Sequence, residues 1–262
     1  MTLVLIHGGI IAALLAAGWL FPRVQRADAW RHTALNLFTG GSLALARMGL
    51  ASLLVGWSAT RGGLIDLCHV RIPLVQFLVV FLISDFARYW VHYCHHRFPA
   101  LWRFHRVHHS SEHLDASSGL RMHWVDFVQL TLIPVMLFAV VFDVSTFAGW
   151  VWPALVVTTD LFDAIGHANV GMTLEHPLAA AWGRAFNNPV FHSWHHSTDP
   201  SAYNSNYGQA LTIWDRIFNT ALDRPDPAME FGLPEDEALD TSWLGLQRLR
   251  PAPRQGQAAR LQ

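Results

Sequence analysis

Apolar runs, each long enough for a membrane helix, alternate with polar segments along the chain. The five runs cover about residues 3–21, 34–57, 72–91, 125–142 and 146–165. About 20 consecutive apolar residues span the hydrocarbon core of a bilayer, so the pattern predicts membrane helices. Only three residues separate the last two runs, which predicts a helical hairpin. Residues 92–124 and 166–222 are polar, and we expect both to lie outside the lipid.

The composition agrees with an integral membrane protein. Hydrophobic residues make up 52% of the 262 residues and charged residues only 14%, against about 25% charged residues in a soluble domain. The net charge of -1 gives no basic face for nucleic acid. Two cysteines are too few for a disulfide framework. We therefore expect an all-α, polytopic fold of about four to five transmembrane helices with a helical cap.

A basic cluster after the first run predicts the orientation in the membrane. Arg23, Arg26 and Arg31 should lie in the cytoplasm, because short cytoplasmic loops are rich in Arg and Lys. Counting the runs from there places both polar segments on the cytoplasmic face, where they would form the cap. The order of apolar and polar segments predicts three parts of the chain: N-terminal membrane helices over 1–70, a catalytic domain over 71–222 and a polar tail over 223–262.

Histidine is unusually frequent for a chain with so few charged residues, because sixteen are present. Half of them stand in one HxxxH and two HxxHH motifs, whose helical spacing should direct the imidazoles of each motif to one point. Imidazole binds Fe, Zn, Cu and Ni. The motifs hold more imidazoles than one tetrahedral zinc ion can bind, which favours two metal ions. The predicted ligands, including two histidines at the ends of the hairpin, are His92, His96, His105, His108, His109, His123, His167, His192, His195 and His196.

Three other histidines are predicted to be free of metal. His95 adjoins His96, so on a helix it points about 100° away from that ligand. His113 and His176 belong to no motif.

Several stretches together resemble one family. Residues 89–111 (YWVHYCHHRFPALWRFHRVHHSS) and 191–222 (FHSWHHSTDPSAYNSNYGQALTIWDRIFNTAL) carry the histidine motifs, and GLRMH at 119–123 and GHANV at 166–170 stand between them. These stretches resemble the histidine boxes and the Arg-x-His and His-x-Asn elements of the fatty acid hydroxylase and sterol desaturase superfamily. The resemblance covers about residues 80–222.

This resemblance implies a non-haem di-iron centre with two Fe ions, which uses O2 to hydroxylate a C–H bond of a lipid such as a fatty acyl chain or a sterol. Lipid desaturation by the same centre is the alternative. A metal-binding membrane transporter is less favoured, because the histidines lie at the ends of the runs rather than along a path through them. No G-x-G-x-x-G motif is present, so a separate ferredoxin- or cytochrome-type donor with its reductase should supply electrons.

Two polar residues are candidates for orienting the ligands. Asp85 precedes His92 by about two turns and either orients a ligand imidazole or pairs with Arg88. Asn169 either holds a water or a histidine, or caps a helix.

Overall fold

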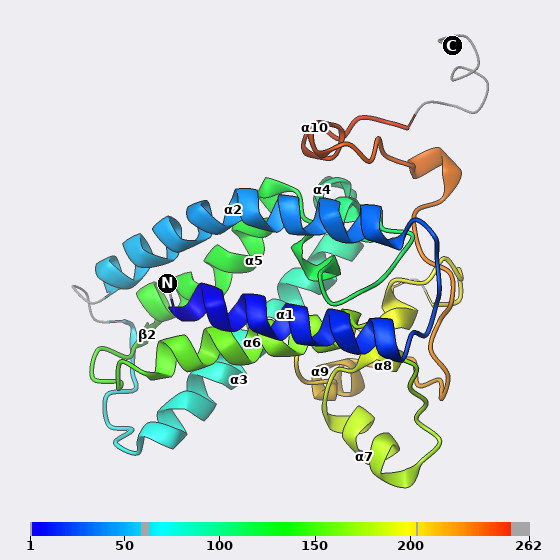
Figure 1. Ribbon diagram of the computed structural model, residues 1–262. Helices are drawn as coiled ribbons and strands as arrows, with labels where there is room; N and C mark the ends of the chain where they lie inside the picture. Colours follow the sequence, from blue (N-terminus) through cyan, green and yellow to red (C-terminus); the bar gives the residue numbers. More distant parts are fainter. Residues whose placement is uncertain (1, 59–62, 203, 253–262) are drawn as a thin grey trace.

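The computed structural model describes residues 2–58, 63–202 and 204–252 and is mostly helical (Figure 1). Its longer helices lie on the five apolar runs: α1 (Thr2–Leu20), α2 (Ala29–Ser58), α3 (Pro73–Arg97), α5 (Trp124–Met136) and α6 (Val151–His167). The shorter helices are α4 (Pro99–His109), α7 (Pro177–Ala185), α8 (Pro189–His195), α9 (Ile213–Ile217) and α10 (Trp243–Gln247). The other elements are the 3₁₀ turns η1 (Ser118–Leu120) and η3 (Glu235–Glu237), the π-helical turn η2 (Leu137–Val141), and the strands β1 (Ile65–Asp66) and β2 (Phe142–Asp143). The predicted helical character is confirmed.

Prolines mark where four helices begin, including the three that carry the histidine motifs. α3, α4, α7 and α8 each start at a proline, which suits the first helical position because its missing N–H would have no partner there. Phe98 precedes Pro99 and is extended, with φ -110° and ψ 118°, as expected before proline. α3 therefore ends before α4 begins, and the first two histidine motifs lie on separate helices.

The N-terminal helix packs on the helices that carry the site. α1 lies beside α6, with α2 above them in Figure 1. Ile11 of α1 packs with Ala116 and with Ala164 of α6 in a buried cluster. η1 also meets α6 closely, because a Cβ at Gly119 would clash with the Asp163 carboxylate. α1 is thus packed against the predicted catalytic segment.

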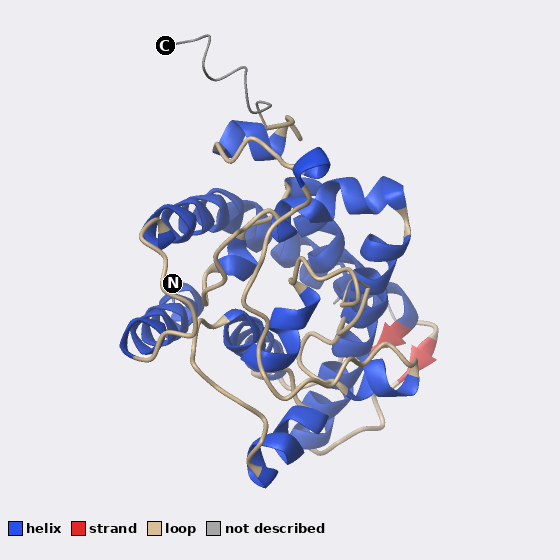
Figure 2. Ribbon diagram, turned by 90° about the vertical axis from the view of Figure 1, so that its right-hand side faces the viewer, coloured by secondary structure: helices blue, strands red, loops and turns tan. Residues whose placement is uncertain are grey.

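The connection between α5 and α6 is longer than the predicted hairpin turn. Pro134 lies inside α5, which continues into η2. β2 then pairs in parallel with β1, shown as the red strands in Figure 2. α6 starts only at Val151. The pairing joins segments more than 70 residues apart, so the local sequence pattern did not indicate it.

α3 is long and apolar enough to cross a membrane, judged over the residues whose side chains are described. Leu5–Leu20 and Trp124–Met136 are shorter apolar helices. The exposed side chains of α3 include Leu74, Leu78 and Leu82, which share one face because they are four residues apart. Length and composition thus support one of the predicted spans, and the others stay predictions.

The C-terminal segment is more tightly packed than a polar tail, as far as residue 252. Leu239 and Leu246 are buried against Val107 of α4. Glu237 accepts a hydrogen bond from Trp102 Nε1 at 2.8 Å. These contacts hold the segment against the histidine-bearing helix α4, while the end of the predicted tail, residues 253–262, lies outside the described residues.

Replacing Leu246 by alanine should lower the free energy of unfolding by about 2–5 kcal/mol, because the side chain is fully buried and its loss leaves a cavity. Leu244→Ala is the matched control, since Leu244 is 49% exposed and should change stability by less than about 0.5 kcal/mol. Urea unfolding in detergent measures both. Equal effects would show that the segment does not pack on α4.

Candidate metal centre

Five histidines from three helices form one group. α3 supplies two of them, α4 two and α8 one, and their nearest ring nitrogens lie within 4.8 Å of one another: His92, His96, His105, His109 and His195. The Nε2 atom of every member is buried and has no hydrogen-bond partner within the described residues. Buried polar atoms normally have partners. Five unpartnered nitrogens that converge on one point therefore fit a metal ion.

A second group of four lies beside the first and consists of His108, His167, His192 and His196. His167 Nε2 lies 3.2 Å from His108 Nε2 and 3.1 Å from His192 Nε2. Neighbouring nitrogens that share one ion at about 2.1 Å lie about 3.0–3.4 Å apart, for octahedral and tetrahedral geometry respectively. The second group therefore also fits a metal ion.

Each HxxHH motif contributes to both groups. In α4 the i and i+4 histidines, His105 and His109, belong to the group of five, and His108 between them belongs to the group of four. In the second motif His192 and His196 belong to the group of four and His195 to the group of five. The motif spacing predicted that the histidines of each motif converge on one point. The structure corrects this, because i+3 faces a different direction from i and i+4 by roughly 60–100°.

Burial favours the neutral form of several of these imidazoles. It lowers the pKa of His195 to about 3, and it lowers the pKa of His108, His109 and His196 well below the usual value, because an imidazolium loses its hydration inside the protein. Only the neutral ring offers a lone pair to a metal. At neutral pH these side chains can bind metal without first losing a proton.

Hydrogen bonds at the opposite ring nitrogens set the orientation of several rings. A ligating histidine usually donates its second N–H to a carbonyl or carboxylate, which leaves the other nitrogen for the metal. Such contacts join Nδ1 of His92 to Tyr207 O (2.8 Å), Nδ1 of His105 to Asp126 Oδ2 (3.0 Å), Nδ1 of His167 to Asp163 O (2.7 Å) and Nδ1 of His195 to Ser205 O (2.8 Å).

Asp126 is a site residue that the sequence analysis missed. Its side chain is fully buried in the first turn of α5, and its other oxygen, Oδ1, lies 3.4 Å from His95 Nε2. His95 Nε2 also contacts Gln129 Oε1 at 2.7 Å. An acid at the start of an apolar run was the available signal. Its pairing with two histidines depends on how α5 packs against α3 and α4.

Asp85 holds a loop rather than a ligand. Its carboxylate accepts hydrogen bonds from the N–H groups of Ala210 and Leu211 at 3.0 and 3.1 Å and from Trp214 Nε1 at 2.9 Å. This loop follows Tyr207, whose carbonyl faces His92. Within the described residues, Asp85 therefore affects the site only indirectly, by holding the loop that follows Tyr207.

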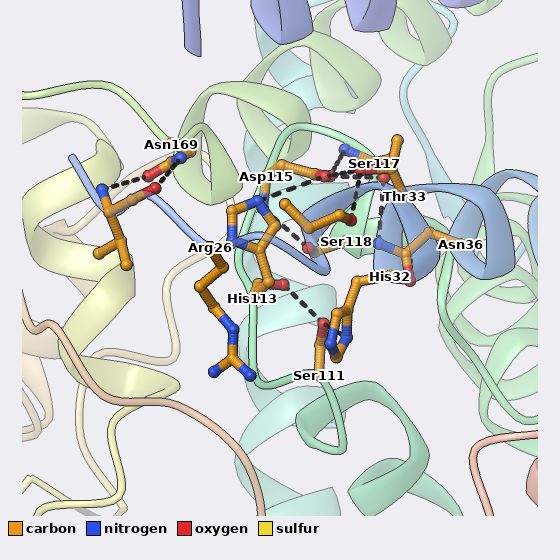
Figure 3. A network of polar contacts seen from close by, with 12 residues as sticks. Arg26, His32, Thr33, Asn36, Ser111, His113, Asp115, Ser117, Ser118 and Asn169 are labelled. Atoms are coloured by element: carbon orange, nitrogen blue, oxygen red, sulfur yellow. Dashed lines mark hydrogen bonds and ion pairs between the residues drawn. The ribbon is translucent and has the colours of Figure 1, made fainter. Parts of the chain in front are cut away.

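Asn169 and His123 lie apart from both groups. Asn169 hydrogen-bonds the N–H and the carbonyl of Val24, and so joins the end of α6 to the segment between α1 and α2 (Figure 3). His123 Nδ1 accepts from Val125 N at 3.1 Å, and its Nε2 donates to Gln247 O at 3.0 Å. Both ring nitrogens are thus engaged. Of the ten predicted ligands, the structure brings the other nine together.

A polar network anchors the loop after α4 to α2, as Figure 3 shows. Thr33 donates to Asp115 at 2.5 Å, and Asn36 donates to Ser117 at 3.0 Å. The fully buried Arg121 donates to Asn36 at 2.7 Å. His113 lies in this network, 3.9 Å from an Asp115 oxygen and outside both histidine groups. The network fixes the segment that leads from α4 to α5.

Known proteins share the segment that carries these groups. The fatty acid hydroxylase family matches residues 77–220, more than half of the chain. Ornithine lipid hydroxylase OlsE of Rhizobium tropici is 32% identical over 156 residues, 58% of this chain and 44% of that protein. Alkylglycerol monooxygenase of Danio rerio is 31% identical over 163 residues, 59% of this chain and 32% of that protein.

A more distant relative is methylsterol monooxygenase 1-3 of Arabidopsis thaliana, 24% identical over 148 residues, 56% of this chain and 48% of the relative. The matched segments cover less than half the length of each of these relatives. No solved structure shows significant similarity to the chain. The family match over more than half of the chain shows that the chain belongs to the fatty acid hydroxylase family.

Proposed function

We propose that the chain is a membrane-bound, iron-dependent oxygenase that hydroxylates a C–H bond of a lipid. The pair of buried histidine groups is the observation that carries this proposal. Nine imidazoles exceed the ligand needs of one ion, so two ions suit the donor set. Iron is the metal we propose, because imidazole binds it and the relatives are named hydroxylases and monooxygenases.

The proposed reaction consumes the lipid, O2, two electrons and two protons, and it yields an alcohol and water. The bound iron would supply the O2 activation, which no amino-acid side chain provides. A separate ferredoxin- or cytochrome-type protein would supply the electrons. The names of the relatives favour hydroxylation over desaturation.

The side chains of this protein would hold the centre and keep it dry. His105 donates to Asp126 and His195 donates to a backbone carbonyl, while Nδ1 of His92 lies within hydrogen-bond distance of both Tyr207 O and Gln209 Nε2. These contacts fix which nitrogen of each ring is free for metal. Because eight of the nine histidines are buried and His96 only partly so, bulk water has little access to the two groups.

Metal analysis and lipid analysis test the proposal together. Protein purified in detergent should hold about two iron atoms per chain, one for each group. Lipids from cells that express the chain should include a species with one additional oxygen atom. Zinc alone, with turnover unaffected by removal of iron, would contradict the proposal. A loss of two hydrogens without a gain of oxygen would indicate desaturation instead.

We further propose that the histidine groups face the cytoplasm in a multi-pass protein. Arg23 donates to Pro189 O at 3.0 Å, and Arg26 contacts Glu112 Oε2 at 3.0 Å. The basic cluster thus lies at the same end of the bundle as α8 and the loop after α4. Basic residues near membrane helices favour the cytoplasmic side.

Cysteine labelling in intact cells tests this orientation, after Cys68 and Cys94 are replaced by serine. Glu235→Cys should react with a membrane-impermeant maleimide only after permeabilisation, because η3 contacts α4 at the histidine end. Leu64→Cys, at an 86% exposed position next to β1, should react in intact cells. The reverse pattern would overturn the orientation.

A further inference from the structure

A cavity of about 620 Å³ lies between α3 and α5. Its walls extend from Ile83 and Phe142 to His95 and Leu101. Twelve residues of α3 separate Ile83 from His95, which corresponds to about 18 Å along the helix axis. The cavity is therefore long and narrow, and its volume lies in the range of about 300–1,000 Å³ that small-molecule sites occupy.

The cavity approaches the metal groups only at its histidine end. Ala87 lies in the wall of the cavity, and His96 follows it by nine residues. Nine residues rotate an α-helix by about 180°, so these two side chains lie on opposite faces of α3. His95 closes the cavity on this side, and its ring stacks on that of His105 with centroids 5.2 Å apart. A molecule in the cavity would reach the neighbourhood of the group of five through this end.

The mouth of the cavity is apolar and exposed. Phe86, Trp90 and Ile133 line it and are 39%, 36% and 44% exposed. α3 is the helix long and apolar enough to cross a membrane within the described side chains. An apolar opening along such a helix suits the hydrocarbon chain of a membrane lipid, which needs no hydrogen bonds from the wall.

Gln129 interrupts the apolar wall at the histidine end. His95 Nε2 lies 2.7 Å from Gln129 Oε1 and 3.4 Å from Asp126 Oδ1. A carboxylate only accepts hydrogen bonds, so these two oxygens favour the proton on Nε2, and His95 donates to the amide oxygen. The amide nitrogen of Gln129 then keeps its donors, and the hydrogen bonds of the described residues include none from it.

We propose that this cavity binds the hydrocarbon chain of the lipid substrate and that Gln129 donates a hydrogen bond to an oxygen of that lipid. The acceptor is a carbonyl, ether or hydroxyl oxygen at the histidine-proximal end of the chain. The oxidised carbon then lies near this oxygen rather than near the terminal methyl group. Naming the lipid as the substrate rests on the proposed function, whereas its binding requires neither metal nor turnover.

Photolabelling tests the site without relying on activity. The probes are methyl hexadecanoate and hexadecane, each with a diazirine near one chain end, added to the purified chain in nanodiscs. After irradiation, peptide mass spectrometry should find both probes on α3 and α5 residues of the cavity. Ile133→Trp should reduce the labelling by both probes, because it fills the cavity. Met136→Trp is the matched control, since Met136 is 38% exposed on the same helix and lies outside the cavity.

Gln129→Leu separates recognition of the oxygen from filling of the cavity. It should reduce cavity labelling by the ester about fivefold, as expected for one lost hydrogen bond, and leave labelling by the alkane within twofold. Equal effects on both probes would overturn the role of Gln129. Labelling that Ile133→Trp does not change, or a cavity occupied by another protein helix, would overturn the site. Normal labelling in a protein without iron or turnover would contradict the proposed function alone.

Discussion

Replacing His196 by alanine should remove one of the two proposed iron ions and reduce turnover by more than about 100-fold. That reduction exceeds the usual effect of losing a partner outside the ligand set, which is about 10–100-fold. His196 belongs to the group of four and His109 to the group of five. His109→Ala should therefore remove the other ion with a similar loss of turnover. Iron per chain and lipid turnover should be measured on the same preparations.

Two other histidines provide the controls for this prediction. His176→Ala should keep about two iron atoms per chain, because His176 lies outside both groups and caps α7 through Leu178 N. His123→Ala should also keep both irons and lose about 0.5–2 kcal/mol of stability, because it loses a helix cap. If His123→Ala loses one iron while His196→Ala keeps two, the grouping proposed here is wrong.

The hydrophobic pattern predicted where the long helices lie, because a run of apolar side chains is a local property of the sequence. The β1–β2 pairing and the burial of Leu239 and Leu246 were not predictable in the same way. Both depend on contacts between distant segments. In the tail, isolated leucines among polar residues show no helical or strand periodicity that would indicate a buried face.

Histidine spacing predicted that histidines from these motifs would cluster, because the i, i+3 and i+4 positions of a helix lie close together. It did not predict how the two HxxHH motifs divide between two groups. That division depends on the approach of α8 to α4, which places His109 and His196 in a stacked pair with ring centroids 4.3 Å apart. His123 matched the pattern by its place at the end of a run, but its ring nitrogens hydrogen-bond Val125 and Gln247.

The spacing of residues along the chain could not predict the role of Asp126, since its partners His95 and His105 lie more than 20 residues earlier in the chain. Asp85 shows the converse. It precedes His92 by two helical turns, yet its hydrogen bonds go to Ala210, Leu211 and Trp214. Which buried acid faces a ligand was decided by the packing of α5 and of the loop after Tyr207.

Replacing Asp126 by asparagine should lower the affinity of the group of five for iron by about 10–100-fold. Asp126 Oδ2 accepts from His105 Nδ1 at 3.0 Å, which keeps Nε2 of that ring free for the metal. The carboxylate is fully buried, and a bound dication would balance its charge. Asparagine removes the charge and replaces one carboxylate oxygen by an NH2 group, which would face the proton on either His95 Nε2 or His105 Nδ1.

Competition with a chelator of known affinity measures this loss, and Asp115→Asn is the matched control. Asp115 is also a buried acid, 4% exposed, but it accepts from Thr33 and Ser117 in the network of Figure 3 and lies outside the histidine groups. Asp115→Asn should reduce stability and leave iron affinity within twofold. If both variants lose affinity equally, the effect comes from general loosening of the buried polar network. If only Asp126→Asn loses it, the carboxylate acts through His105 on the metal.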